Sequence, residues 1–181
     1  LKRDTQYQVS VDANAKATDG NTMGSTYSFR FRTVGYLEVA QVIPAPDTDE
    51  VEASSTITVI FNRPVVPLMT VSDLTQADLP QPLTLDPPVE GSGEWLNTSI
   101  YVFSPTKALA GGVTYSARIA SGLADTTGGV MADDYRWSFT TQPPQITWTA
   151  PRDREDLVPI GANIQMSFNM PIDAESAGAA F

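Results

Sequence analysis

The densest group of side chains that could bind an ion is the segment PDTDEVE, residues 46–52. Calcium takes about six to eight oxygen ligands, and closely spaced carboxylates can supply them. The segment has no glycine and no distal glutamate at the positions that an EF-hand loop uses. We therefore interpret it as a solvated acidic turn between two strands and predict no metal site. If a structural calcium ion binds, the candidate ligands are Asp47, Asp49, Glu50 and Glu52.

Two other acidic motifs could serve catalysis or a turn. Paired carboxylates hydrolyse glycosides when they face each other across a groove. Asp133 and Asp134 are adjacent, however, and precede a strand, so their side chains should point to different sides. Asp125, in LADTTGG, fits an Asx-type turn that the following glycines complete. We assign all three residues to turns.

The chain has no cysteine and no histidine. Disulfides, thiolate nucleophiles, zinc sites built from these residues and the Ser-His-Asp and Cys-His systems are therefore excluded. We predict that the chain is not an enzyme, that it has no catalytic residue and that it binds no cofactor.

Three tryptophans could form a platform on which a sugar ring stacks. Trp137 is in phase with Tyr135 and Phe139, which predicts a place in the core. Trp95 follows a glycine-rich turn region, so it is the candidate ligand-contacting residue. The ligand itself stays unknown.

The charge of the chain restricts its partners. Acidic residues number 21 and basic residues 11, for a formal net charge of -10. Phosphate backbones and anionic lipids would be repelled, so nucleic acid is excluded as a partner. We also expect no membrane insertion, since no run of 18 apolar residues occurs. The chain starts at Leu1, with no basic-then-apolar leader, and we interpret it as a fragment.

Alternation of apolar and polar residues predicts the elements that carry these motifs. Ile57, Val59 and Phe61 alternate with more polar neighbours, which is typical of strands with one buried face. The predicted strands are residues 38–43, 57–61, 99–105, 115–119 and 135–139, with weaker ones near Leu83 and Trp95. This pattern predicts an all-β immunoglobulin-like antiparallel β-sandwich. A short helix is predicted after Asp173, within residues 173–181.

The chain also repeats itself. YSFRFRT at 27–33 recurs as YRWSFTT at 135–141, so that Tyr27 aligns with Tyr135. ITVIFNRPV at 57–65 recurs as IQMSFNMPI at 164–172, so that Phe61 aligns with Phe168. The two echoes come from different halves of one unit, so they predict tandem repeats. The predicted divisions are 1–34 for the C-terminal half of one unit, 35–142 for a complete domain and 143–181 for the N-terminal half of the next.

These motifs resemble a known family of modules. FNRPV at 61–65, VFSP at 102–105, TY at 114–115 and WSFTT at 137–141 are similar to the bacterial Ig-like repeat of the S-layer type. FNRPVVPL at 61–68 and PPVEGSGEW at 87–95 also resemble the Ig-like modules near the amino end of bacterial alpha-2-macroglobulins. Such proteins trap proteases, often through a thioester made from Cys and Gln. A chain without cysteine would then be scaffold rather than trap.

The resemblance implies a non-catalytic structural or interaction module of a secreted or surface-anchored bacterial protein. We expect an extracellular, cell-surface or periplasmic location, and a role as scaffold of an alpha-2-macroglobulin-like inhibitor. The alternatives are a repeat of an adhesin or S-layer-type array, and a spacer domain of a secreted hydrolase. The expected partners are neighbouring domains of the same protein, with another protein or a cell-wall glycan also open. Strand exchange or self-association through the incomplete units 1–34 and 143–181 is expected, because each exposes apolar strands.

Overall fold

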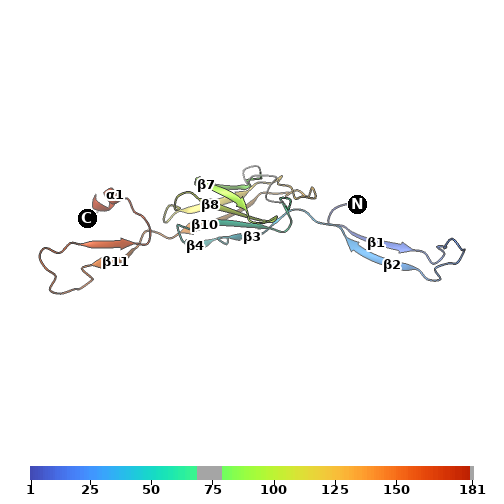
Figure 1. The fold of residues 1–181 in the computed structure, drawn as a ribbon, viewed down its shortest axis with the longest axis horizontal. Coiled ribbons are helices and arrows are strands. Elements are labelled where there is room, and N and C mark those ends of the chain that lie inside the picture. Colours follow the sequence, from blue (N-terminus) through green and yellow to red (C-terminus); the bar gives the residue numbers. More distant parts are fainter. Residues whose placement is uncertain (69–78, 180–181) are drawn as a thin grey trace.

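A computed structural model describes residues 1–68 and 79–179. The molecule is elongated, with a sandwich of two sheets at its centre and one β-hairpin at each end (Figure 1). The N-terminal hairpin pairs β1 (Gln6–Val11) with β2 (Tyr27–Arg32). The C-terminal hairpin pairs β11 (Ile146–Ala150) with β12 (Gln165–Phe168). The two hairpins therefore lie far from each other within one copy of the chain.

Two four-stranded sheets form the central sandwich. The first has the order β3 (Val39–Ile43), β5 (Ile57–Phe61), β8 (Ile100–Pro105), β7 (Gly91–Trp95). The second has the order β4 (Thr48–Val51), β10 (Tyr135–Thr141), β9 (Thr114–Ile119), β6 (Leu83–Asp86). The chain crosses repeatedly from one sheet to the other, so both sheets contribute to one shared core.

The core confirms the alternation predicted from the sequence. Along β5, Ile57 and Val59 are fully buried while Thr58 and Ile60 are only partly buried. Along β10, the buried side chains include those of Trp137 and Phe139. Inward side chains of both sheets belong to a single apolar cluster, as expected of a sandwich. Because this burial supplies most of the folding free energy, it also fixes which face of each strand points inward.

The structure confirms the turn predicted at residues 46–52 only at residues 46–47 and corrects the rest. Residues 48–51 form strand β4, which pairs with β10 in parallel through Phe139 with Thr48 and Thr141 with Val51. Val51 is buried, whereas Asp49 and Glu50 are exposed. A strand at the edge of a sheet can carry acidic side chains because one of its edges and one of its faces meet water. The sandwich is therefore antiparallel except at this one edge strand among those described.

The N-terminal hairpin has the geometry of β9 and β10, its counterparts in the repeated sequence. Tyr7 pairs with Phe31 as Tyr115 pairs with Phe139, and the ring centroids lie 5.5 and 5.6 Å apart in the two pairs. The hydroxyl of Thr33 donates to the carbonyl oxygen of residue 2 at 2.6 Å, and that of Thr141 to the carbonyl oxygen of residue 110 at 2.6 Å. The strands, the turn and its hydrogen bonds thus coincide in the two segments.

The C-terminal hairpin matches β3 and β5 in the same way. Its irregular register between Ile146 and Trp148 falls at the same step as the irregularity between Val39 and Gln41. The side-chain oxygen of Asn169 accepts from the backbone N–H of residue 145 at 2.9 Å, as that of Asn62 does from residue 38 at 2.9 Å. The two terminal hairpins therefore have the geometry of different halves of the central sandwich.

The described helix is α1 (Ala174–Ala179), which begins after Asp173 as predicted. The Asp173 carboxylate accepts a hydrogen bond from the Ser176 backbone N–H at 2.6 Å, as an N-cap residue does. This bond, together with a hydrogen bond from the Ser176 hydroxyl, lowers the pKa of Asp173. Residues 180–181 of the predicted helical segment lie outside the described residues. In the described parts of the chain, we find no helix with the length and apolarity that crossing a bilayer requires.

Candidate functional site

The four candidate calcium ligands are exposed along β4 and its flanks. The Asp47 carboxylate accepts a hydrogen bond from the Ser138 hydroxyl at 2.9 Å, and the Asp47 backbone N–H donates to the Ser138 carbonyl oxygen at 2.7 Å. These bonds fasten the start of β4 to β10. Across residues 1–68 and 79–179, no three acidic side chains converge as a metal ion would require. Asp47 therefore has a bracing role that the sequence did not predict.

Trp95, the candidate ligand-contacting residue, is buried, and the structure corrects that assignment. Only 5% of its surface is exposed. Its ring stacks on Phe61 with centroids 5.7 Å apart and meets Tyr101 edge-on at 5.4 Å. Its indole N–H donates to the Pro80 carbonyl oxygen at 2.9 Å. Trp95 is a core residue of the first sheet and is not available to stack on a glycan.

The glycines before Trp95 lie in strand β7, although glycines so close together in the sequence are typical of a turn. A Cβ on Gly93 would lie 1.7 Å from the Tyr101 hydroxyl oxygen, and one on Gly91 would lie 2.4 Å from the Phe103 ring. Both glycines leave room for aromatic side chains of the neighbouring strand β8. Burial also raises the pKa of Tyr101 to about 12, while its hydroxyl donates to Gln81 at 2.7 Å.

Asp134 braces the two neighbouring strands β9 and β10. It accepts hydrogen bonds from Arg118 and Arg136 at 2.8 Å each, and from the Ser121 backbone N–H at 2.9 Å. The bond from Arg118, followed by that from Ser121, holds the pKa of Asp134 well below its usual range. Asp133 is exposed. The turn role predicted for this pair is consistent with these contacts.

Asp125 organises the end of the sandwich that faces the N-terminal hairpin. Its Oδ1 atom accepts hydrogen bonds from the Thr127 N–H at 2.7 Å, the Thr127 hydroxyl at 2.8 Å and the Gly129 N–H at 2.7 Å. Only 1% of its side chain is exposed, and its Oδ2 atom faces the Arg63 guanidinium at 3.7 Å. The Asx-type turn predicted here is thus confirmed. Its burial and its contact with Arg63 were not predicted.

The pKa of Asp125 reports the balance of these contacts. Burial on its own raises the pKa, because a charged carboxylate loses hydration. The hydrogen bonds from Gly129 and Thr127, with the positive charge of Arg3, outweigh burial and hold the pKa below its usual value. The carboxylate is therefore charged in the folded protein at neutral pH.

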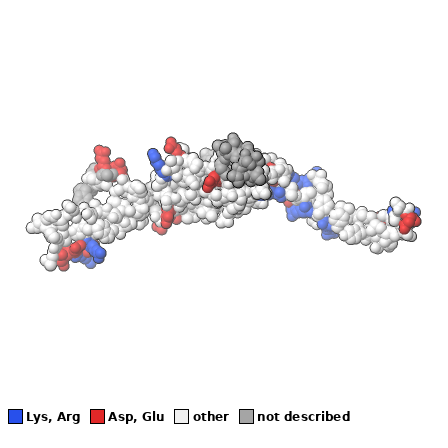
Figure 2. All heavy atoms as spheres, in the orientation of Figure 1, with Lys and Arg blue, Asp and Glu red and all other residues white. Residues whose placement is uncertain are grey.

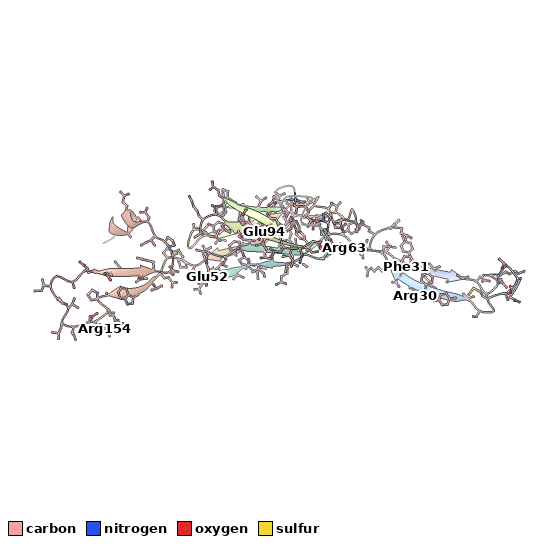
Figure 3. The ribbon with its side chains drawn as sticks, in the orientation of Figure 1. Arg30, Phe31, Glu52, Arg63, Glu94 and Arg154 are labelled. Atoms are coloured by element: carbon pink, nitrogen blue, oxygen red, sulfur yellow. The ribbon has the colours of Figure 1, made fainter. Side chains whose placement is uncertain are left out.

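Arg3 joins the N-terminal hairpin to this turn. Its guanidinium donates to the carbonyl oxygen of Thr127, to the Thr127 hydroxyl at 3.3 Å and to the Gly35 carbonyl oxygen at 3.1 Å. A Cβ on Gly129 would lie 2.8 Å from the Arg3 guanidinium, so a side chain there would displace it. We call Arg3, Gly35, Arg63, Asp125 and Thr127 the N-terminal junction. Arg63 lies at the end of the sandwich nearest the N-terminal hairpin (Figure 3).

The opposite end of the sandwich meets the C-terminal hairpin at the corresponding positions. In the repeated sequence, Gly111 is the counterpart of Arg3, and Met170 is the counterpart of Arg63. A Cβ on Gly111 would lie 2.3 Å from the Met170 sulfur and 3.0 Å from the Gln142 carbonyl oxygen. Met170 also lines a surface hollow with Glu52, which Figure 3 places at this end. The two ends of the sandwich thus use the same two aligned positions. Arginines occupy both positions at the N-terminal end, and Gly111 contacts Met170 at the C-terminal end.

Sequence reasoning missed the N-terminal junction because its members are far apart in the chain. Arg3 and Thr127 are separated by 124 residues and have no shared periodicity. The sequence did contain one indication of this junction, at two pairs of aligned positions, 3 with 111 and 63 with 170. In each pair an arginine in one copy aligns with a small or apolar residue in the other.

The family assignment agrees with this architecture. The family described as bacterial Ig-like domain matches residues 35–141, which include β3 to β10. The chain belongs to this family. Over 131 residues the bacterial Ig-like chain is 24% identical to an alpha-2-macroglobulin homolog of Nostoc sp., and the match covers 71% of this chain and 7% of that protein.

Solved structures similar to the Ig-like chain include two transpeptidases. An L,D-transpeptidase from Mycobacterium smegmatis has a TM-score of 0.41 and 20% identity, covering 61% of this chain and 41% of that one. L,D-transpeptidase 3 from Mycobacterium tuberculosis, in complex with a faropenem-derived adduct, has a TM-score of 0.41 and 15% identity, covering 72% and 45%. The Ig-like chain therefore spans less than half the length of each of these relatives.

Proposed function

We propose that this Ig-like chain is a non-catalytic structural module of an exported bacterial protein, and that it forms part of the scaffold of an alpha-2-macroglobulin-like protease inhibitor. The observation that carries the proposal is the similarity to the Nostoc alpha-2-macroglobulin homolog, which extends over 131 residues and thus beyond the single family domain. The module works outside the cytoplasm, at the cell surface, in the periplasm or in the medium.

The role of the module is mechanical. The sandwich is a rigid body, because its two sheets share one buried cluster. The N-terminal junction holds the preceding hairpin through side-chain hydrogen bonds, and the contact of Gly111 with Met170 holds the following one. Tandem units joined in this way would set the distance and the angle between other parts of the parent protein.

The decisive experiment uses the full-length parent protein. Methylamine opens an internal thioester and adds to the chain, so the intact mass is measured before and after treatment. One adduct per parent chain, together with retention of a challenge protease in the same complex on gel filtration, supports a scaffold within a protease trap. A parent that gains no adduct and retains no protease refutes the inhibitor proposal.

The repeated hairpin geometry favours a second candidate, a repeat of an adhesin or S-layer-type array. Both terminal hairpins reproduce the strand registers of the central domain, as further copies in such an array would. Binding of the parent to purified cell-wall glycan, without any retention of protease, would support the array and not the inhibitor.

A further inference from the structure

The two segments that link the hairpins to the sandwich differ in length by one residue. Residues 34–37 form the N-terminal linker, between β2 and β3, and residues 142–144 form the C-terminal linker, between β10 and β11. Up to residue 34 the two copies of the repeat are offset by 108 positions, and from residue 36 onward they are offset by 107. Gly35 is therefore an extra residue, and the C-terminal linker has no counterpart of it.

The start of each linker is bonded to the unit before it. The Val34 carbonyl oxygen accepts a hydrogen bond from the Asp4 N–H at 2.9 Å, and the Gln142 carbonyl oxygen accepts one from the Gly112 N–H at 3.0 Å. The Gln142 N–H also donates to the Val51 carbonyl oxygen at 2.9 Å. Because these bonds join backbone atoms, they hold the start of a linker whatever its side chains are.

The end of each linker is bonded to the unit after it by an asparagine. The Asn62 amide group donates to the Tyr36 carbonyl oxygen at 3.2 Å, and the Asn169 amide group donates to the Pro143 carbonyl oxygen at 3.1 Å. Each asparagine also accepts from the backbone N–H two residues further along, at 2.9 Å in both units. Gly35 thus lies between two fixed points that are adjacent residues in the C-terminal linker.

The backbone freedom of the two linkers differs as well. Pro143 and Pro144 each have a φ fixed by the ring, and each restricts the residue before it. Glycine has a wider range of backbone conformations than any other residue. The nearest atom that a Cβ on Gly35 would meet is an Asp4 carboxylate oxygen at 3.8 Å, so packing around this residue is loose. Bending is therefore expected at Gly35 and not in the C-terminal linker.

Arg3 spans the flexible linker from one side to the other. Its guanidinium donates to the Gly35 carbonyl oxygen at 3.1 Å and, within the sandwich, to the Thr127 hydroxyl at 3.3 Å. Asp125 holds Thr127 in place through its N–H and its hydroxyl. Basic side chains gather at this end of the sandwich, where the N-terminal hairpin joins it (Figure 2). At the aligned position of the other junction, Gly111 has no side chain that could span the linker.

We propose that the N-terminal linker is a latched hinge, in which Gly35 supplies the freedom to bend and Arg3 removes it, and that the C-terminal linker is a stiff joint without a latch. This proposal rests on the mechanical role in the proposed function and assigns that role to named residues. The Arg3 bonds are exposed or partly buried, so water competes for them and the latch opens reversibly. When it opens, the preceding unit swings about Gly35 while the following unit keeps its angle.

The test measures distances across each linker in the full 181-residue chain. The chain has no cysteine, so nitroxide labels can be attached at two engineered cysteines alone. Thr18→Cys with Ser92→Cys spans the N-terminal linker, and Ser92→Cys with Ala162→Cys spans the C-terminal linker; all three residues are exposed. Pulsed electron paramagnetic resonance then gives the distribution of distances between the two labels.

Both label pairs are expected to give narrow distributions in the otherwise unchanged chain. Arg3→Ala should widen the distribution of the N-terminal pair at least about twofold and leave that of the C-terminal pair unchanged. Adding Gly35→Ala should reverse at least about half of this widening, because alanine fits the site and has fewer backbone conformations. Arg32→Ala is the matched control, since its exposed ion pair with Asp4 does not cross the hinge.

A glycine inserted between Gln142 and Pro143 places the extra residue in the linker that has no latch. We expect the insertion to widen the distribution of the C-terminal pair at least about twofold, without any change in the N-terminal pair. Circular dichroism and a thermal transition equal to that of the unchanged chain show that the sandwich is folded in each variant.

Four results would overturn the proposal. A broad distribution for the N-terminal pair before any substitution would mean that the latch is not closed. An unchanged distribution in Arg3→Ala would mean that Arg3 holds nothing. Widening that Gly35→Ala does not reduce would place the freedom outside Gly35, and a narrow distribution after the glycine insertion would mean that an extra residue makes no hinge. None of these results changes the methylamine and protease outcomes, so the hinge and the proposed function fail separately.

Discussion

Replacement of Asp125 by alanine tests whether this carboxylate holds the N-terminal junction together. The substitution removes the acceptor of three hydrogen bonds and leaves the N–H groups of Thr127 and Gly129 without it. A hydrogen bond to a charged group contributes about 1.5–3 kcal/mol, and bonds that share one acceptor do not add fully. We expect a loss of about 3 kcal/mol in the free energy of unfolding of the sandwich.

That loss corresponds to a fall in Tm of about 15 °C, because about 1 kcal/mol shifts the Tm of a domain of this size by about 4–8 °C. Asp125→Asn keeps an acceptor oxygen but loses the charge that faces Arg63 at 3.7 Å. Its expected loss is about 1 kcal/mol, or about 5 °C. The assay is thermal unfolding of the intact chain, followed by circular dichroism and calorimetry.

The pH dependence supplies an independent check. The pKa of Asp125 is lower in the folded protein than the usual value of about 3.9 in an unfolded chain. Its contribution to stability is therefore fully present above about pH 4, and it is lost as the pH falls through the folded pKa. The Tm difference between the wild type and Asp125→Asn is expected to be constant from about pH 5 to 7 and to shrink below about pH 4.

Asp133→Ala is the matched control, because Asp133 is an exposed aspartate of the same sheet end. Its Tm should stay within about 2 °C of the wild type, as for most surface substitutions. If Asp125→Ala melted within the same range, or if its effect were equally large at pH 3, the carboxylate would not stabilise the junction and the reasoning would be wrong.

Three further predictions follow from the structure. Trp95→Ala should lower the free energy of unfolding by about 3–5 kcal/mol, because it removes a buried ring and a hydrogen bond. Trp148→Ala, at an exposed residue, should change it by less than about 1 kcal/mol. Equal melting curves for the two variants would contradict the burial of Trp95. Arg3→Ala removes hydrogen bonds between the N-terminal hairpin and the sandwich, so it should widen the distribution of angles between them. Small-angle scattering should show this as a broader distance distribution. Arg32→Ala removes an exposed ion pair with Asp4 and should leave that distance distribution unchanged. Adding calcium, or removing it with a chelator, should change the Tm by less than about 1 °C. The calcium hypothesis would be restored if calcium raised the Tm and if replacing all four acidic residues in 47–52 abolished that rise.

Local patterns predicted the elements whose side chains alternate in character. The strands β3, β5, β8, β9 and β10 lie where alternation of apolar residues placed them. The Asx turn at Asp125 and the cap at Asp173 were also predictable, because a short polar side chain bonds to backbone only a few residues away. Such interactions depend only on residues that are close in the sequence, so they can be predicted without knowledge of the tertiary structure.

Strand β4 and the burial of Trp95 could not be predicted in this way. Three of the four residues of β4 are polar, and the strand forms because β10 offers an open edge to its backbone. Trp95 follows Gly91 and Gly93, which resemble a turn until the rings of β8 are seen beside them. In both regions the deciding partner is distant in the sequence.

The sequence by itself determined the all-β class and which face of each main strand is buried, because apolar and polar residues alternate along these strands. It also determined that no cysteine or histidine chemistry is available to this chain. The tertiary structure alone decided which aromatic rings are covered and which carboxylate is buried against Arg63. Those outcomes depend on contacts between residues far apart in the chain, and the free energy of such contacts exists only once the two sheets have met.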